Sequence, residues 1–142
     1  MTSKTWLQMM AMAALSGACA AALAQQPGAR TDPGQREYLD NCAVCHGRDG
    51  KGLGPYVEWL KRAPPDLTTM SKRNGGVFPL SQAYGVIEGA GAGHGTRDMP
   101  VWGREYSVRA GEYYGDMPYN QEAYVRARIL VLSEYLSRLQ VK

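Results

Sequence analysis

The feature that most constrains this chain is a short run of three reactive side chains, Cys42, Cys45 and His46. Two cysteines three positions apart lie on the same face of a helix, with Cβ atoms about 5–6 Å apart. Each thiol can then form a thioether to one of the two vinyl groups on a porphyrin edge. The histidine that follows places its imidazole under the ring, where it can bind iron. The motif therefore predicts one covalently bound haem c, held by Cys42 and Cys45, with His46 as an iron ligand.

Three other interpretations of the motif explain less. A structural zinc site needs two further ligands, and the rest of the chain offers only Cys19 and His94. A thioredoxin-like redox pair belongs in a βαβ context, which the sequence does not show. A structural disulfide uses both cysteines but gives His46 no role. Haem attachment accounts for all three side chains.

The first 24 residues have the pattern of a secretory signal peptide. Lys4 precedes an apolar run over residues 6–23, which ends in the small-x-small cleavage pattern Ala22-Leu23-Ala24. We predict cleavage after Ala24 and export to the periplasm. Two alternatives are a retained membrane anchor and a lipoprotein modified at Cys19.

Cleavage would leave 118 residues, which suffice for one small domain. We predict a flexible segment over residues 25–31 and a single domain over 32–142. The mature chain has 15 basic and 13 acidic side chains, a net charge of +2, and no basic run. This balance argues against a nucleic-acid partner. Its apolar residues do not alternate, and glycine and proline punctuate short helical segments, so we expect an all-α fold.

Capping residues and apolar periodicity predict five helices. Asp32 is the expected N-cap of the first, with Pro33 at its first position. Asn120 is the expected cap of the last, whose apolar side chains recur every three or four residues. The expected helices span residues 33–45, 55–60, 67–73, 81–89 and 120–139. The charged, tyrosine-rich segment 104–119 is expected to form an insertion loop.

A methionine is the expected second iron ligand, because a thioether opposite histidine stabilises ferrous iron. Outside the leader the candidates are Met70, Met99 and Met117, and Met70 falls on a predicted core face. Met99 and Met117 each precede a proline, which stiffens the chain around a weak ligand. Met99 also follows a glycine-rich loop that can wrap around a haem, and Trp102 can pack on the ring edge. We predict Met99, with Met117 as the alternative; His94 would give a bis-histidine site.

The chain resembles a class I c-type cytochrome of the monohaem, bacterial, periplasmic type. Gly34 and Tyr38 resemble the glycine–aromatic pair on the family's first helix, and Leu132 and Tyr135 the matching pair on its last helix. The resemblance implies the cytochrome c fold, with four to five short helices around one covalently bound haem. It also implies that the first and last helices cross closely at Gly34, where a mid-helix glycine otherwise costs roughly 1 kcal/mol.

The resemblance also implies roles near the iron. Met99-Pro100-x-Trp102 is similar to the family's axial Met-Pro segment. Pro55 is placed like the proline whose carbonyl accepts a hydrogen bond from the ring N–H of the iron-binding histidine, here His46. Such a bond fixes the tautomer and strengthens the ligand.

A cytochrome of this type is expected to be an electron carrier and not an enzyme. Its redox partners would be a dehydrogenase, an oxidase or a reductase, with membrane contact only through them unless the leader is retained. Two alternatives stay open: a haem c subunit of a larger complex docked through residues 104–119, and a peroxidase or sensor with a labile sixth ligand. Candidate partners for the haem propionates or an acidic protein are Arg97, Arg104 and Arg109.

Overall fold

The computed structural model describes residues 32–90 and 99–141, and all regular elements in these ranges are helices. This confirms the all-α prediction. The elements are α2 (Pro33–Asn41), α3 (Ala43–His46), η2 (Val57–Trp59), η3 (Leu67–Thr69), α4 (Met70–Arg73), α5 (Leu80–Glu88), α6 (Trp102–Tyr114) and α7 (Gln121–Arg138). The predictions for the leader, for segment 25–31 and for His94 fall outside the described residues. None of the described helices has the length and apolar character needed to span a bilayer.

Helix α2 begins where its capping residue predicts. The Asp32 carboxylate accepts a hydrogen bond from the backbone N–H of Gly34 at 2.8 Å, and proline occupies the first helical position. The expected helix 33–45 is divided at Cys42, because its φ of −111° departs from helical geometry. The N–H of Cys42 nevertheless bonds to the carbonyl of Tyr38 at 2.8 Å. Helix α3, which carries the rest of the cysteine–histidine motif, therefore follows α2 directly.

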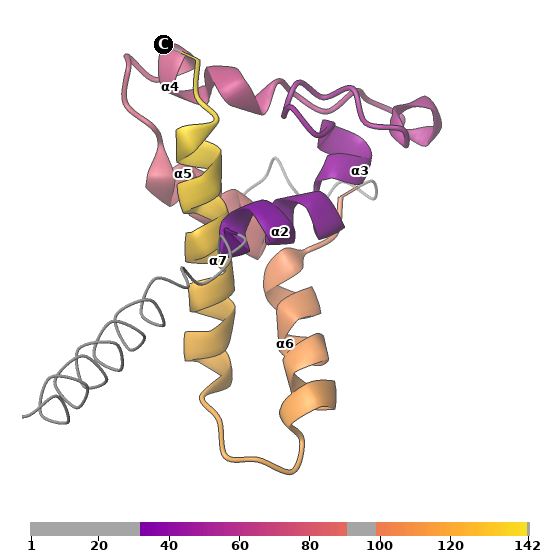
Figure 1. Ribbon diagram of the computed structural model, residues 1–142, viewed down its shortest axis with the longest axis vertical. Helices are drawn as coiled ribbons and strands as arrows, with labels where there is room; N and C mark the ends of the chain where they lie inside the picture. The colour runs from indigo at the N-terminus through magenta and orange to yellow at the C-terminus, as the bar shows by residue number, and fades with distance from the viewer. Residues whose placement is uncertain (1–31, 91–98, 142) are drawn as a thin grey trace, which may run out of the picture. The chain divides into compact units, whose positions relative to one another are not determined.

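Helices α2 and α7 cross (Figure 1), and Gly34 contacts α7 at the crossing, as the resemblance implies. A Cβ atom built on Gly34 would lie 2.8 Å from the Cβ of Tyr135 and would overlap the carbonyl oxygen of Val131. The rings of Tyr38 and Tyr135 pack beside the crossing, with centroids 5.3 Å apart. Only glycine allows the two backbones to approach this closely.

The crossing gives a stability prediction. Gly34→Ala should lower the free energy of unfolding by about 1–3 kcal/mol, because the added methyl group overpacks the contact. Gly111→Ala, in α6, is the matched control: no other heavy atom lies within 4 Å of its Cβ position, so higher helix propensity should stabilise it by up to about 1 kcal/mol. Thermal unfolding of both holoproteins measures the difference. Equal melting temperatures for the two variants would contradict a close crossing.

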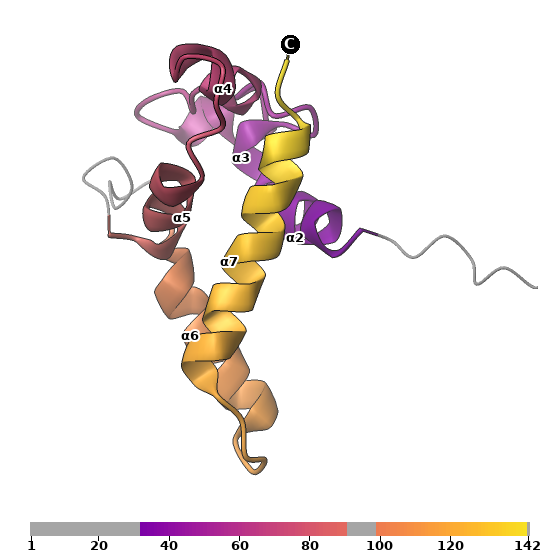
Figure 2. The same ribbon diagram turned by 90° about the vertical axis from the view of Figure 1, so that its left-hand side faces the viewer.

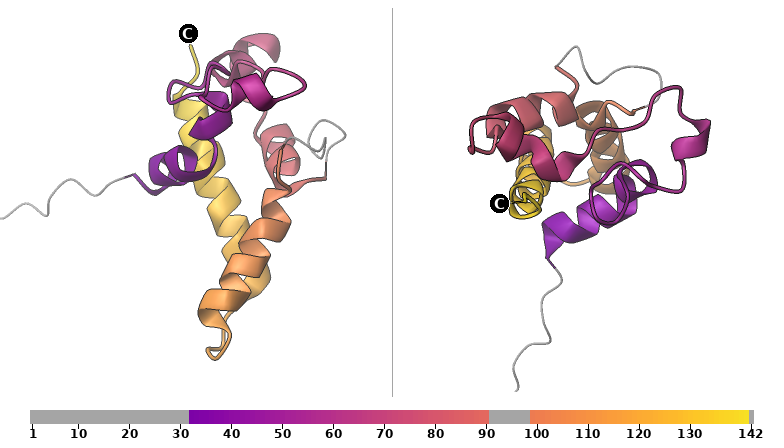
Figure 3. Two further views of the ribbon diagram at one scale, coloured as in Figure 1. Left: turned by 90° about the vertical axis from the view of Figure 1, so that its right-hand side faces the viewer. Right: turned by 90° about the horizontal axis from the view of Figure 1, so that it is seen from above.

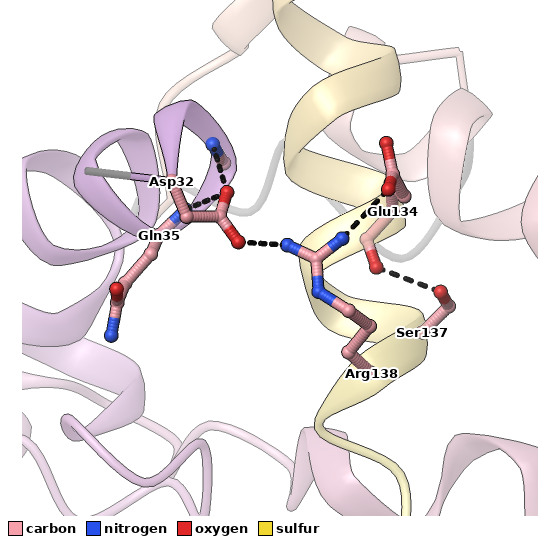
Figure 4. A network of polar contacts seen from close by, with 6 residues as sticks. Asp32, Gln35, Glu134, Ser137 and Arg138 are labelled. Atoms are coloured by element: carbon pink, nitrogen blue, oxygen red, sulfur yellow. Dashed lines mark hydrogen bonds and ion pairs between the residues drawn. The ribbon is translucent and has the colours of Figure 1, made fainter. Parts of the chain in front are cut away.

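A polar network also joins the start of α2 to the end of α7 (Figure 4). The Arg138 guanidinium binds the Asp32 carboxylate, and it binds Glu134 within α7 at 2.7 Å. Burial alone would raise the pKa of Asp32, but hydrogen bonds from the N–H groups of Gln35 and Gly34 and the Arg138 charge hold it below its usual value. The exposed ion pairs themselves contribute little. The Arg138–Asp32 pair nevertheless places the capping carboxylate of α2 against α7, the helix that Gly34 also contacts.

Helix α6 corrects the expectation of an insertion loop over residues 104–119. The buried side chains Trp102, Tyr106 and Ala110 recur every four residues and form one apolar stripe. Two glycines, together with the aromatic residues, a serine and a valine, weaken the intrinsic helix propensity of this segment, so the helix depends on packing against α7. The two helices run antiparallel and are joined by residues 115–120 (Figures 1 and 2).

Helix α7 is the central element, and α2, α5 and α6 all pack against it (Figure 3). Asn120 caps it as predicted, accepting a hydrogen bond from the N–H of Ala123 at 2.9 Å. Its buried side chains Ile129, Leu132 and Leu136 belong to the hydrophobic core. This core also contains parts of α2, α5 and α6, and it borders the candidate site.

Candidate haem-binding site

A cavity of about 320 Å³ lies within the unit formed by residues 32–142. Its lining combines residues from α2, α3, α4, α5, α6 and α7 with others from the segments between them. Four of the side chains nominated from the sequence line it: Cys42, His46, Met99 and Trp102. Most of the remaining lining is apolar, and the volume falls in the range of cofactor pockets. The structure thus brings the thiol and the imidazole of the motif together with a thioether from a distant part of the chain at one apolar site.

The two cysteines differ in environment. Cys42 is buried and lines the cavity, whereas Cys45 is half-buried and is not part of the lining. Burial, followed by the nearby charges of Glu37 and Cys45, raises the pKa of the Cys42 thiol to about 12. Before attachment, Cys42 is therefore held as a neutral thiol inside the site, while Cys45 lies nearer solvent.

His46 ends α3 and lines the cavity, with 7 % of its surface exposed. The turn after it is fixed by the Tyr38 hydroxyl, which donates a hydrogen bond to the Gly47 carbonyl at 2.7 Å. Gly47 has a φ of +77°, a conformation that glycine adopts without strain. Because Tyr38 also packs at the α2–α7 crossing, the same buried side chain connects the crossing to the end of the motif.

The segment after His46 folds back onto α3. The N–H of Gly54 donates to the Cys45 carbonyl at 3.0 Å, and the N–H of Tyr56 donates to the Val44 carbonyl at 2.9 Å. Pro55 lies between these two bonds, beside the motif and exposed at the surface. Its expected hydrogen bond to the His46 ring stays a prediction.

Two of the three candidate methionines line the cavity, and the third does not. Met99 is half-buried, packs against the core and lines the cavity. Met70 also lines the cavity, although its predicted place was on a core face of a helix. Met117 lies in the turn between α6 and α7, is 53 % exposed, and is not part of the lining. The lining therefore separates Met99 and Met70 from Met117, and the assignment of Met99 as the second iron ligand stays a prediction.

Trp102 closes one part of the cavity and is 6 % exposed. The Arg109 guanidinium lies over its ring, 5.7 Å from the centroid. Arg109 also pairs with Glu105 at 3.1 Å and donates to the side-chain oxygen of Asn41 at 3.0 Å. Arg109 was expected to bind a propionate, but its guanidinium is already bound to Glu105 and Asn41, which lie outside the cavity lining.

Sequence reasoning missed the charged residue that does line the cavity. Arg73, at the end of α4, is the single lysine, arginine or carboxylate side chain in the lining that the structure describes; its exposed guanidinium donates a hydrogen bond to the Asp66 carbonyl at 3.0 Å and another to the Thr69 hydroxyl. Asn74 and Gln82 are further polar residues of the lining. Arg104 is not part of this lining, and Arg97 lies outside the described residues. No local signal marks Arg73, because its position depends on how α4 packs between the motif and α5.

These residues fit a covalently bound haem: an apolar cavity, a cysteine, a histidine and two methionines in its lining, and one cationic side chain for the carboxylates. The family model for cytochrome c matches residues 31–104, just over half of the chain, and this match includes the motif, Met99 and Trp102. No curated protein and no solved structure matches the chain. The chain belongs to the cytochrome c family, the haem-binding proteins of electron transport.

Proposed function

We propose that this cytochrome is a monohaem electron carrier of the periplasm, with His46 and Met99 as its iron ligands. The observation that carries the proposal is that both side chains line one apolar cavity with Cys42. When bound, the haem supplies an iron that cycles between its ferrous and ferric forms. If His46 and Met99 both hold the iron, no coordination position would be open to a substrate, which favours electron transfer over substrate chemistry at the metal.

The remaining wall residues set the environment of the site. Apolar side chains such as Leu67, Ile87 and Leu132 exclude water, and burial together with a thioether ligand raises the reduction potential. A high potential suits a carrier that takes single electrons from a dehydrogenase and passes them to an oxidase or a reductase. The signal-peptide pattern of the first 24 residues supports the periplasmic location.

Visible spectroscopy of the ferric holoprotein tests the ligand set. Methionine ligation gives a weak charge-transfer band in the far red, and we expect this band in the resting protein. A high-spin resting spectrum that changes at once on adding cyanide or peroxide would contradict the proposal and favour a peroxidase or sensor.

Arg73 provides a second test of the site. As the cationic side chain in the described lining, it is proposed to neutralise a haem propionate. Arg73→Ala should lower the reduction potential by some tens of millivolts and make it more pH-dependent near neutrality, because the propionate pKa would rise. Lys72→Ala is the matched control: it removes the same charge one residue earlier, from a side chain that is exposed, as Arg73 is, but that lies outside the lining. Equal shifts of the reduction potential in the two variants would contradict the proposal that Arg73 neutralises a propionate.

A second candidate function is that of a subunit in a larger dehydrogenase or oxidase. The supporting observation is a tyrosine cluster at the end of the α6–α7 hairpin, where the rings of Tyr113 and Tyr114 lie 4.7 Å apart and Tyr113 is 75 % exposed. Tyrosine is enriched at protein interfaces. Tyr113→Ser with Met117→Ser changes only exposed side chains. Loss of co-purification with a membrane complex in this variant would support the subunit role, and release of the wild-type protein as a free monomer would contradict it.

A further inference from the structure

A buried carboxylate lies where α2 packs against α7, outside the cavity lining that the structure describes. Glu37 of α2 is only 5 % exposed and is not part of this lining. It accepts a hydrogen bond from the side-chain amide of Asn41 at 2.7 Å, and it pairs with the Arg128 guanidinium of α7 at 2.9 Å. A buried ion pair is weak evidence for stability, because removing two charges from water can cost more than their attraction returns. The burial of Glu37 therefore calls for an explanation other than stability.

Two aromatic rings hold Arg128 in its pairing position. Its guanidinium lies 5.7 Å from the ring centroid of Tyr106 and 5.4 Å from that of Tyr124, within the range of cation–π attraction. The Arg128 side chain is 42 % exposed, whereas the Glu37 side chain is 5 % exposed. Solvent and salt screen an exposed charge more strongly than a buried one. Inside the protein, the negative charge of Glu37 is therefore only partly offset by its partner.

The charge of Glu37 reaches two side chains at or next to the cavity wall. After burial, it is the largest cause that raises the pKa of the Cys42 thiol. After burial, it is also the largest cause that raises the pKa of the Tyr106 hydroxyl, and the ring of Tyr106 packs against that of Trp102 with centroids 5.7 Å apart. Cys42 and Trp102 both line the cavity. The carboxylate therefore acts on this wall from the α2 side and from the α6 side.

We propose that Glu37 lowers the reduction potential of the haem by holding a fixed negative charge beside the cavity, and that Arg128 limits this effect as its counter-charge. This inference rests on the proposed electron-carrier function and names a residue that sets the working potential of the carrier. A nearby negative charge stabilises ferric iron over ferrous iron, because the ferric form has one more positive charge. The interaction is strong at this place because few polarisable water molecules separate a buried charge from a buried cofactor. Glu37 would then act against the thioether ligand, which raises the potential.

Glu37→Gln removes the charge and keeps the shape of the side chain. Redox titration of the holoprotein should show a potential raised by about 59 mV, a tenfold change in the equilibrium constant of a one-electron couple, and high salt should not abolish the shift. The control is Glu122→Gln, which removes the same charge from an 82 % exposed side chain that also pairs with an arginine of α7. We expect less than about a twofold change in the equilibrium constant for this control, and none at high salt. Equal shifts in the two variants, or no shift in Glu37→Gln, would overturn the inference. The far-red methionine band tests the proposed ligands separately, because neither substitution touches them.

Arg128→Gln distinguishes an electrostatic role from a structural one. It breaks the same ion pair as Glu37→Gln, so both variants should lose stability. We expect it to lower the potential at about pH 8, where carboxylates are ordinarily ionised, and by less than Glu37→Gln raises it. Arg128→Lys keeps the charge and should retain a potential close to that of the wild type. If loosening of the fold were the cause, water would enter the site and both charge-removing variants would shift the potential in the same direction. Shifts of the same sign, or equal shifts for Arg128→Lys and Arg128→Gln, would contradict the proposal.

Discussion

Replacing Met99 with alanine is expected to lower the reduction potential of the holoprotein by on the order of 0.1–0.2 V, within the range over which haem ligands set potentials. The reason is the loss of the thioether that stabilises ferrous iron. The same change should open a coordination position, so that cyanide binds the ferric protein and carbon monoxide the ferrous protein. Redox titration and ligand-binding spectra measure both effects. Met99 is the right target because it is half-buried and lines the cavity that also contains His46.

Met117→Ala is the control for this experiment. Met117 also precedes a proline, but it lies in an exposed turn outside the cavity lining. We expect its potential and its ligand-binding spectra to match those of the wild type. A fall in potential for Met117→Ala, with Met99→Ala unchanged, would show that the wrong sulfur had been assigned.

Cys42→Ala is expected to leave the haem attached by a single thioether. The holoprotein should then be less stable by about 2–4 kcal/mol, comparable to losing another covalent cross-link. Because Cys42 is buried against the cavity, the substitution also removes packing there. Denaturant unfolding measures the stability, and the pyridine haemochrome spectrum reports how many vinyl groups have reacted.

Val44→Ala is the control for the cysteine variant. Val44 stands between the two cysteines but is exposed, so its truncation should change neither the haemochrome spectrum nor the stability appreciably. If Cys42→Ala retained a two-thioether spectrum and full stability, the covalent role assigned to Cys42 would be wrong.

The parts of the fold that could be predicted from sequence are those set by local chemistry. Asp32 and Asn120 cap α2 and α7 because their short polar side chains reach the first free backbone N–H groups. The crossing at Gly34 could be expected only from the family resemblance. A single glycine within a predicted helix does not by itself identify which other helix packs against it. The structure shows that helix to be α7.

The parts that could not be predicted depend on contacts between distant segments. Helix α6 was expected to be a loop. Its buried side chains occur only at every fourth residue, and the glycines and charged residues between them obscure this helical periodicity in the sequence. Arg73 and Met70 line the cavity through the packing of the short helix α4, which no pattern in the sequence reveals. Met99 and Met117 share the Met-Pro signal, and the glycine-rich loop before Met99 and Trp102 after it favoured Met99 from the sequence; the tertiary fold adds that Met99 lines the cavity and Met117 does not.

The intact mass of the exported protein, measured together with its visible spectrum, tests the central claim most directly. We expect residues 25–142 plus one haem, with a Soret band and a haemochrome typical of two thioethers. A secreted product with the mass of the bare polypeptide and no Soret absorbance would contradict the account of the site and of its function.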